Sequence, residues 1–210
     1  TGDIDPAMDL PGYNPVIPLD KEKVKAMAAA LSKSKRPVLL VGHGVLISRA
    51  WDAVRRLAET LQAPVTTTLL GKGAIPESHP LSLGMLGMHG TAYANKAMVE
   101  CDLVLSIGSR YDDRIIGQAG RFCREAVRMH IDVDASEINK MIKVHHYCVG
   151  DAGEVMTELT RQVRKLDTAD WLHLLDGYKK KFPLKYKKQG GLKMQHILHE
   201  LDKLTGGKAI

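Results

Sequence analysis

The stretch Val38-Leu39-Leu40-Val41-Gly42-His43-Gly44 decides the fold. Four consecutive apolar residues that end at a glycine are typical of a strand buried on both faces of a parallel sheet. Apolar residues at helical spacing follow the strand, at positions 54, 57, 58 and 61. Because a buried strand followed by an amphipathic helix is the first half of a β-α-β unit, this stretch predicts an α/β protein.

The same alternation continues on both sides of this stretch. Before it, residues 20–31 carry apolar side chains at positions i, i+3, i+4 and i+7, which predicts a helix. Further strands are expected at 64–69, 103–108, 127–133 and 144–149, and further helices at 91–100, 135–141 and 153–165. The sequence therefore predicts a doubly wound, mostly parallel, Rossmann-like sheet of five or six strands, with helices on both faces and ligands at the carboxyl ends of the strands.

Composition divides the chain into three segments. Residues 1–19 contain four prolines and two glycines, which excludes a helix and suits an extended interdomain linker. Residues 20–167 form the α/β domain. Residues 168–210 are expected to form a short helix near Trp171, a basic connector over 179–188 and one more helix before Gly206-Gly207. Since residues 208–210 resemble the start of a strand, we expect a further domain to have been cut off there.

Charge and cysteine content limit the kinds of partner. The net charge is +6, but residues 171–210 hold nine lysines against three acidic residues, so the rest of the chain is neutral. A general nucleic-acid surface is therefore disfavoured. The three cysteines are far apart, which favours free thiols in a reducing compartment and predicts a cytoplasmic protein or one of an organelle matrix. No secretory leader and no run of 18 apolar residues is present, so no membrane span is expected.

The turn Gly42-His43-Gly44 follows a strand and precedes a helix, as a dinucleotide-binding fingerprint would. The third glycine of that fingerprint is missing, because position 47 is Ile, and no acidic residue closes the next strand. A plain NAD-dependent dehydrogenase is therefore disfavoured. The two glycines either let backbone N–H groups approach an anionic or planar ligand, or they form a tight turn without one.

Residues 84–90, Gly-Met-Leu-Gly-Met-His-Gly, contain three glycines and are expected to form a loop instead of a helix or a strand. A flat ring system could approach such a loop closely, with Met88 as a soft apolar contact and His89 as a polar one. His89 could equally be a structural histidine whose hydrogen bonds are satisfied within the protein.

Charged side chains follow two of the predicted strands. Residues 108–114, Gly-Ser-Arg-Tyr-Asp-Asp-Arg, come directly after one of them. There Arg110 could neutralise a diphosphate, or the segment could be a surface cluster of salt bridges. Asp132 and Asp134 end the other strand, where one carboxylate suits a ribose hydroxyl and the other could cap the next helix.

Three short motifs resemble parts of metal sites, but each of them lacks a further ligand. Gly150-Asp151 resembles the start of a thiamine-diphosphate metal motif, but that motif needs a downstream asparagine, and the last one is Asn139. Asp151 is then a helix N-cap or a cofactor contact. There are two pairs of histidines, His145 with His146 and His196 with His199, and neither pair has a third ligand. The Lys-rich stretch 178–188 resembles a nucleic-acid patch in composition, but a solvated connector explains it better.

Four segments together closely resemble the central domain of the acetohydroxyacid (acetolactate) synthase family: residues 36–42, 84–91 with Asn95, 102–114 and 130–134. The resemblance covers nearly the whole chain, and residues 10–13 and 182–186 resemble the linkers of that family. The family joins two 2-oxo acids, either two pyruvates or pyruvate and 2-oxobutyrate, with loss of carbon dioxide in branched-chain amino-acid synthesis. Thiamine diphosphate and magnesium do that chemistry, so both would belong to the parent enzyme.

The resemblance implies that residues 20–167 are a central FAD- or nucleotide-binding domain, with FAD along the strand ends. The residues it would contact are Gly42, His43, Gly44, Thr68, Leu69, Leu86, Gly87, Met88, His89, Gly108, Ser109, Arg110, Tyr111, Asp112, Arg114, Asp132, Val133, Asp151 and Ala152. His43 departs from the glycine of many members. In the family this flavin performs no net redox step, and the catalytic and metal-binding residues lie in other domains. No catalytic or metal-binding residue is therefore expected in this chain.

Other interpretations remain open. The chain could be a structural or assembly domain whose nucleotide site stays empty, or the same domain of another thiamine-diphosphate enzyme, such as a glyoxylate carboligase, a pyruvate oxidase or a decarboxylase. On the acetolactate synthase interpretation, the chain alone is inactive. On the same interpretation its partners are the flanking domains of the same polypeptide and further copies in a homo-oligomer, with a regulatory subunit as a further candidate and without nucleic acid or membrane.

Overall fold

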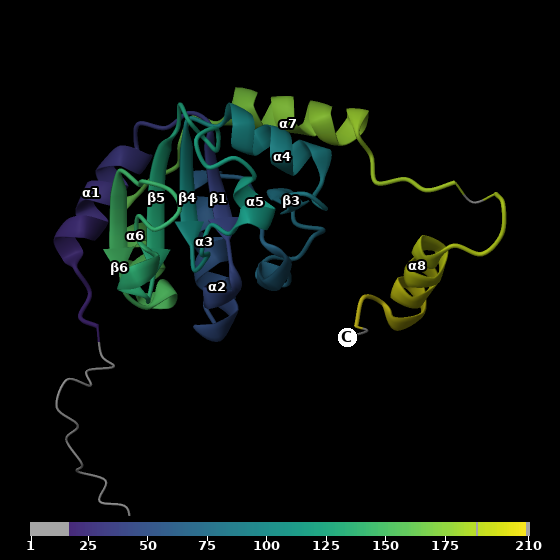
Figure 1. Ribbon diagram of the computed structural model, residues 1–210, viewed down its shortest axis with the longest axis horizontal. Coiled ribbons are helices and arrows are strands. Elements are labelled where there is room, and N and C mark those ends of the chain that lie inside the picture. Colours follow the sequence, from purple (N-terminus) through teal and green to yellow (C-terminus); the bar gives the residue numbers. More distant parts are fainter. Residues whose placement is uncertain (1–16, 188, 209–210) are drawn as a thin grey trace, which may run out of the picture.

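The structure is a computed structural model that describes residues 17–187 and 189–208 (Figure 1). Six parallel strands form one sheet, in the order β3-β2-β1-β4-β5-β6. They are β1 (Pro37–Val41), β2 (Val65–Thr67), β3 (Ser82–Met85), β4 (Leu103–Ile107), β5 (Val127–Asp132) and β6 (His146–Val149). The predicted doubly wound parallel sheet is confirmed.

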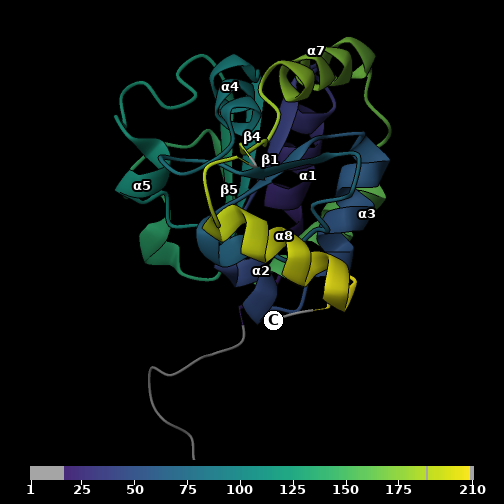
Figure 2. The same ribbon diagram turned by 90° about the vertical axis from the view of Figure 1, so that its right-hand side faces the viewer.

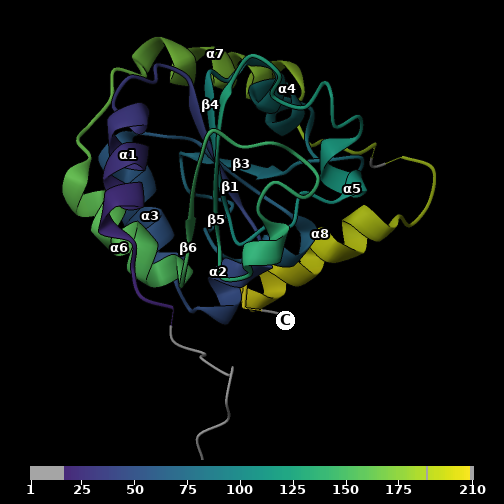
Figure 3. The same ribbon diagram turned by 60° about the vertical axis from the view of Figure 1, so that its left-hand side comes forward.

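Helices cover both faces of the sheet. They are α1 (Lys21–Leu31), α2 (His43–Ile47), α3 (Trp51–Leu61), α4 (Ala92–Glu100), α5 (Asp113–Ile116), α6 (Ala152–Gln162), α7 (Ala169–Lys181) and α8 (Met194–Thr205). Two 3₁₀ turns, η1 (Leu69–Gly71) and η2 (Ala135–Glu137), complete the set in the described residues. Figure 3 shows α1, α3 and α6 together on one side of the sheet, and Figures 1 and 2 both show α7 alongside α4.

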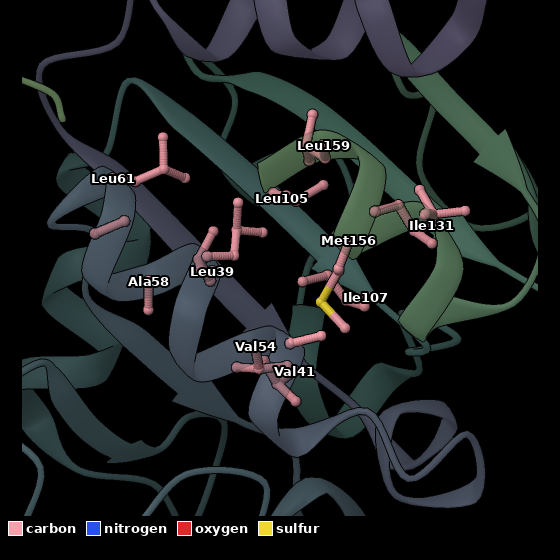
Figure 4. Close-up of a cluster of buried hydrophobic side chains, with 14 of the residues drawn as sticks. Leu39, Val41, Val54, Ala58, Leu61, Leu105, Ile107, Ile131, Met156 and Leu159 are labelled. Carbon is pink, nitrogen blue, oxygen red and sulfur yellow. The ribbon is translucent and has the colours of Figure 1, made fainter. Parts of the chain in front are cut away.

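The central strands are apolar throughout because each of their two sides faces a separate core. Leu39 and Val41 of β1 point to the core under α1, α3 and α6, which also holds Leu105 and Ile107 of β4 (Figure 4). The alternate residues of β1, Val38 and Leu40, belong to the second core, against α4 and α7. This period of two is the reason why a continuous apolar run forms a strand here.

The strand order places the crossover reversal between β1 and β4. From β1 the chain proceeds to β2 and β3 on one side and later to β4, β5 and β6 on the other. In an open α/β sheet the crevice at such a switch point, at the carboxyl ends of the strands, is the usual ligand site. In Figure 1 this edge of the sheet faces downward, close to α2.

The prediction of a continuous loop over residues 84–90 was wrong at its beginning. Gly84 and Met85 belong to β3, the edge strand, where Gly84 adopts a φ of +67°. Side chains from neighbouring segments hold this strand, since the Thr66 hydroxyl donates to the Gly84 carbonyl at 2.9 Å and the Thr91 hydroxyl donates to the Leu83 carbonyl at 2.8 Å. Pairing with β2 thus overrides the poor strand propensity of glycine.

The predicted helix over residues 135–141 was also wrong, because only the single 3₁₀ turn η2 forms there. Asn139 lies in the left-handed region with a φ of +61°, and its side-chain oxygen accepts a hydrogen bond from the Val144 amide at 2.8 Å. A short polar side chain that bonds the backbone ahead of it competes with helix formation. The segment therefore turns towards β6 without continuing as a helix.

The helix expected from the apolar positions 54, 57, 58 and 61 is α3, and a separate short helix, α2, precedes it. Arg49 has a φ of +52°, and the Ala50 amide donates to the Val45 carbonyl at 2.8 Å, which closes α2 before α3 begins. Towards the other end of the chain, α7 continues to Lys181, so the first three residues of the predicted connector over 179–188 belong to a helix. Trp171 and Leu175 of α7 are buried in the second core.

The structure describes the two ends of the chain only in part. The predicted linker at 1–19 and its resemblance at 10–13 lie mostly outside the described residues, as do the last two residues of the predicted strand start at 208–210. None of the side chains of α8 is buried, and Figure 1 shows this helix apart from the sheet. Within residues 17–187 and 189–208, no helix combines the length and the apolar character needed to cross a membrane.

Candidate functional site at the strand ends

The predicted site residues meet at one edge of the sheet. Each parallel strand is followed there by predicted contacts: Gly42 after β1, Thr68 after β2, Leu86 after β3, Gly108 after β4, Val133 close behind β5 and Asp151 close behind β6. Since all six strands run in the same direction, their carboxyl ends share this edge. The topology thus brings together segments that are more than 100 residues apart in the sequence.

The glycines after β1 and β4 pack against each other at the switch point. A Cβ atom on Gly42 would lie 2.1 Å from the Gly108 carbonyl oxygen, and one on Gly44 would lie 2.7 Å from the Gly108 Cα. Gly108 itself has a φ of +59°, and its carbonyl accepts a hydrogen bond from the Gly44 amide at 3.1 Å. These glycines are therefore required for contact between two backbones, while the His43 side chain beside them is exposed.

The turn after β2 packs against the carboxyl end of β1. A Cβ atom on Gly71 would lie 2.3 Å from the Val41 carbonyl oxygen, so the turn also needs glycine. The Thr68 hydroxyl accepts a hydrogen bond from the Gly71 amide at 3.0 Å and thereby caps η1. Thr68 is buried, whereas Leu69 next to it is exposed.

The loop after β3 joins the segment after β4, although β2 and β1 separate these strands in the sheet. The Met88 amide donates to the Arg114 carbonyl at 3.3 Å, and a Cβ atom on Gly87 would lie 2.5 Å from the same carbonyl oxygen. Asn95 fixes Gly87 from the other side, with hydrogen bonds of 2.9 and 3.0 Å to its amide and carbonyl. As a result Met88 and His89 are exposed, while Leu86 belongs to the second core.

The segment after β4 separates into a buried anchor and exposed charges. Tyr111, with a φ of +54°, is 2% exposed, and its hydroxyl donates to the Met129 carbonyl at 3.3 Å. Burial raises the pKa of this phenol well above its ordinary value. Its ring therefore belongs to the core, and Arg110 beside it points to solvent.

Acidic residues in the same segment bond to backbone or lie in solvent. Asp112 caps α5 by accepting a hydrogen bond from the Arg114 amide at 3.1 Å. Asp113 and Arg114 form an ion pair of 3.8 Å with both side chains more than 70% exposed. Such a pair adds little stability, so Arg110 and Arg114 remain available to an anionic ligand.

Asp132 and Asp134 have different environments, and Asp134 is the one that caps the following turn. Asp134 caps η2 by accepting from the Ser136 amide at 2.8 Å, and its hydrogen bonds with Ser136 lower the pKa of its carboxyl group. Asp132 is only 9% exposed, and one of its oxygens accepts from the Asp134 amide at 3.0 Å. The other lies 3.6 Å from Nε2 of His130.

Asp151 is the N-cap of α6. One carboxylate oxygen accepts hydrogen bonds from the Gly153 and Glu154 amides at 2.8 and 3.1 Å. The following Ala152 is buried against the sheet. An open groove of about 460 Å³ borders this helix and is lined by Asp151, Glu154, Glu158, Arg161 and neighbours. The groove lies at the β6 side of the sheet, away from the switch point between β1 and β4.

Exposed apolar side chains and unpaired buried hydroxyls occur together at the strand ends. Leu69, Leu70, Met88 and Val133 are between 60% and 69% exposed. Within the described residues, the buried hydroxyl oxygens of Thr67 and Ser109 have no hydrogen-bond partner. Leu70 and Thr67 were not among the predicted site residues. The apolar pair Leu69-Leu70, close behind a strand, is the signal that could have identified Leu70. Large exposed apolar side chains beside unpaired polar atoms are typical of a binding surface.

Comparison with known proteins agrees with this geometry. Residues 24–159 match the family described as thiamine pyrophosphate enzyme, central domain. The chain is 38% identical over 213 residues to acetolactate synthase from Mycobacterium bovis, a match that covers 98% of this chain and 34% of that protein. It is 44% identical over 176 residues to a probable acetolactate synthase large subunit from Methanocaldococcus jannaschii, covering 82% of this chain and 30% of that one.

A third relative has the same relation to the chain. The acetolactate synthase large subunit of Corynebacterium glutamicum is 41% identical over 212 residues, which are 98% of this chain and 34% of that subunit. The chain thus spans about a third of the length of the curated relatives it matches. The family match begins within α1, ends within α6 and includes all six strands. The chain therefore belongs to the family of central domains of thiamine pyrophosphate enzymes.

Proposed function

We propose that the chain is the FAD-binding central domain of an acetolactate synthase large subunit. The relatives named above support the enzyme, since they are 38% to 44% identical to the chain. One observation supports the cofactor most directly. Exposed apolar side chains follow the strands at the same edge of the sheet where the buried hydroxyls of Thr67 and Ser109 have no partner within the described residues.

The residues at the strand ends fit the three parts of FAD. The exposed side chains of Leu69, Leu70 and Met88 suit a flat and largely apolar ring system. Arg110 is exposed beside the switch point, where its guanidinium can donate to a diphosphate. The Asp132 oxygen that faces away from the Asp134 amide can accept from a ribose hydroxyl.

In this proposal the chain binds and orients a cofactor and does not perform the condensation. The condensation of two pyruvates, or of pyruvate with 2-oxobutyrate, requires thiamine diphosphate and magnesium, which belong to the other two thirds of the polypeptide. No residue of this chain has a catalytic role. When bound, FAD would be held by the residues that follow the strands, and its rings would cover the exposed apolar side chains there.

The proposal also gives the chain its partners. Its first partners are the flanking domains of the same polypeptide, because the relatives are about three times as long as the chain. We infer that the whole subunit forms a homo-oligomer in the cytoplasm and associates with a regulatory subunit. The exposed apolar residues of α8, such as Ile197 and Leu201, suit burial against a neighbouring domain.

FAD titration of the chain tests the cofactor assignment. Quenching of flavin fluorescence is expected to saturate in the unaltered chain. Replacing Arg110 by glutamine removes a charged hydrogen bond of about 1.5–3 kcal/mol and is expected to weaken binding at least tenfold. The matched control is Arg124→Gln, an exposed arginine whose charge pairs with Glu125 at 3.6 Å and which has no place in the proposed site. Equal effects of the two substitutions would contradict the proposed site.

A second candidate is an assembly domain with an empty nucleotide site. The backbone contact between Gly42 and Gly108 favours it, because these glycines serve packing whether or not a ligand is present. Lack of binding at saturating FAD would support this candidate and contradict the first.

Assays of the reaction test the enzyme assignment. The chain alone is expected to form no acetolactate from pyruvate, and the complete polypeptide with thiamine diphosphate and magnesium is expected to form it. If the complete polypeptide instead released peroxide or an aldehyde, a related oxidase or decarboxylase would replace the synthase. Acetolactate formation by the chain alone would show that a catalytic residue had been overlooked.

A further inference from the structure

His130 is a buried polar residue in the middle of the sheet. It lies on β5 opposite Ser106 of β4, and its side chain is 0% exposed. A histidine at such a position costs free energy unless its ring nitrogens are used. The residue therefore needs an explanation that the apolar pattern of the strand does not give.

One ring nitrogen of His130 holds the segment that follows β4. Nε2 lies 2.9 Å from the Ser109 carbonyl oxygen. Because a carbonyl oxygen can only accept a hydrogen bond, Nε2 must donate, and the proton of the imidazole lies on Nε2. Nδ1 has no partner within the described part of the chain, which agrees with an unprotonated nitrogen.

The same N–H group also faces Asp132. The distance from Nε2 to the second carboxylate oxygen of Asp132 is 3.6 Å. This is longer than a hydrogen bond, but it places the positive end of the N–H dipole beside the carboxylate. His130 thus lies between the Ser109 carbonyl, in the loop after β4, and Asp132, at the end of its own strand β5.

The ring of Tyr111 fixes the orientation of His130. The two rings make an edge-to-face contact, with centroids 5.0 Å apart and an angle of 66° between their planes. Tyr111 makes a second edge-to-face contact with Phe122, in which the ring centroids are 5.8 Å apart and the planes form an angle of 74°. The imidazole cannot turn freely in this packing, so Nε2 stays directed at Ser109.

We propose that His130 is a positioning residue for the FAD site, which rests on the function proposed above. Its Nε2–H holds the Ser109 carbonyl, and through it the turn that presents Arg110 next to Asp132. His130 does not touch the ligand. It sets the relative positions of the two loops from which the diphosphate and the ribose are bound.

The tautomer of His130 can be measured without any ligand. Nitrogen-15 spectra of the imidazole rings distinguish a protonated from an unprotonated Nε2, and the signal of His130 is identified by its loss in His130→Gln. The proton is expected on Nε2. A proton on Nδ1 would overturn the proposal, since Nε2 could then not donate to Ser109.

A pair of substitutions tests the positioning role. The side-chain amide of Gln reaches the place of Nε2, whereas that of Asn reaches the place of Nδ1. FAD affinity is expected within about twofold of the unaltered chain in His130→Gln, and about tenfold weaker in His130→Asn, which leaves the buried Ser109 carbonyl unpaired. A purely structural role would lower the melting temperature of both variants and leave their affinities alike, which would overturn the proposal.

Failure of this proposal is distinguishable from failure of the proposed function. If the unaltered chain binds no FAD, the proposed function is wrong and the role of His130 is wrong with it. If the unaltered chain binds FAD and His130→Asn binds it equally well, only the role of His130 is wrong.

Discussion

At the scale of single residues, the contact between Gly42 and Gly108 brings two strand ends closer than any side chain would allow. An alanine Cβ at position 42 would lie 2.1 Å from the Gly108 carbonyl oxygen, so one of the two backbones would have to move. We expect Gly42→Ala to lower the free energy of unfolding by about 3 kcal/mol, as in other overpacked cores. Urea denaturation followed by circular dichroism measures the change.

The control for this substitution is Gly177→Ala. Gly177 lies in α7, and a Cβ atom there would have no atom within 4 Å. Alanine in the interior of a helix is favoured over glycine by about 0.5–1 kcal/mol, so this variant is expected to be slightly more stable. If both variants were equally stable, close packing at the switch point would be disproved.

The buried thiol of Cys123 makes stability depend on pH. Its hydrogen bond with Cys101, at 3.9 Å between the sulfur atoms, and its burial raise the pKa of Cys123 above 9.0, the ordinary value. Below the pKa of the unfolded thiol, this group is protonated in both states and its contribution is fully present. As the pH rises above that value, the unfolded thiol ionises first and the contribution is lost.

The free energy of unfolding is therefore expected to fall by about 1.4 kcal/mol for each pH unit above 9, until the folded thiol ionises. Denaturation curves at pH 8, 9 and 10 measure this fall. Cys123→Ala is expected to show a shallower dependence than the unaltered chain. Parallel curves for the two proteins would contradict a raised pKa at Cys123.

The sequence could predict the residues whose role depends on the backbone next to them. Asp134 was expected as a possible cap and caps η2, because an acidic residue just before a helical turn bonds the amide two residues ahead. Tyr111 could not be assigned in this way. It lies among charged residues in the sequence, and only a φ of +54° turns its ring into the core. The role of His130 likewise depends on Ser109, which is 21 residues away.

At the scale of elements, the central strands and the edge strand β6 were predictable, whereas the other edge strand, β3, was not. β1 and β4 are buried along their whole length, so their sequence alone identifies them. β3 lies at the edge of the sheet, contains Gly84 and pairs on one side with β2, so its sequence carries no comparable pattern. α7 is longer than the short helix expected near Trp171, and contacts distant in sequence hold it to the sheet, since the Trp171 indole N–H donates to the Pro37 carbonyl at 3.1 Å across 134 residues.

The first turn of α6 allows capping to be separated from ligand binding at Asp151. Asp151→Ala removes two hydrogen bonds to helix amides and is expected to cost about 1 kcal/mol of stability. Asp151→Asn keeps the capping oxygen and is expected to lower the free energy of unfolding by only a few tenths of a kcal/mol. Thermal unfolding of both variants measures the cap. If Asp151 also contacts FAD, Asp151→Asn weakens FAD binding while stability is kept, whereas unchanged affinity limits Asp151 to capping.

At the scale of the whole molecule, the described chain consists of a densely packed sheet with its helices and of one further helix, α8, in which no residue is buried and whose histidines contact Tyr186 of the connector. The two cores hold the strands and seven of the helices, α1 to α7, and the Tyr178 hydroxyl of α7 donates to Glu100 of α4 at 2.8 Å. In α8, by contrast, Met194, Leu198 and Leu204 are at least 60% exposed. Stability in a protein follows packing more than helix propensity, so these parts are expected to unfold separately.

Amide hydrogen exchange tests this difference. Amides of β1 and β4 are expected to exchange only through global unfolding, and those of α8 about a thousandfold faster or more, because an isolated helix of 12 residues is marginal in water. Ending the chain after residue 183 is expected to leave the melting temperature of the sheet unchanged. If α8 were protected as strongly as β4, or if its removal lowered the melting temperature, α8 would have to be held by the sheet. In that case its exposed apolar face would not be free for the neighbouring domain to which the proposed function assigns it.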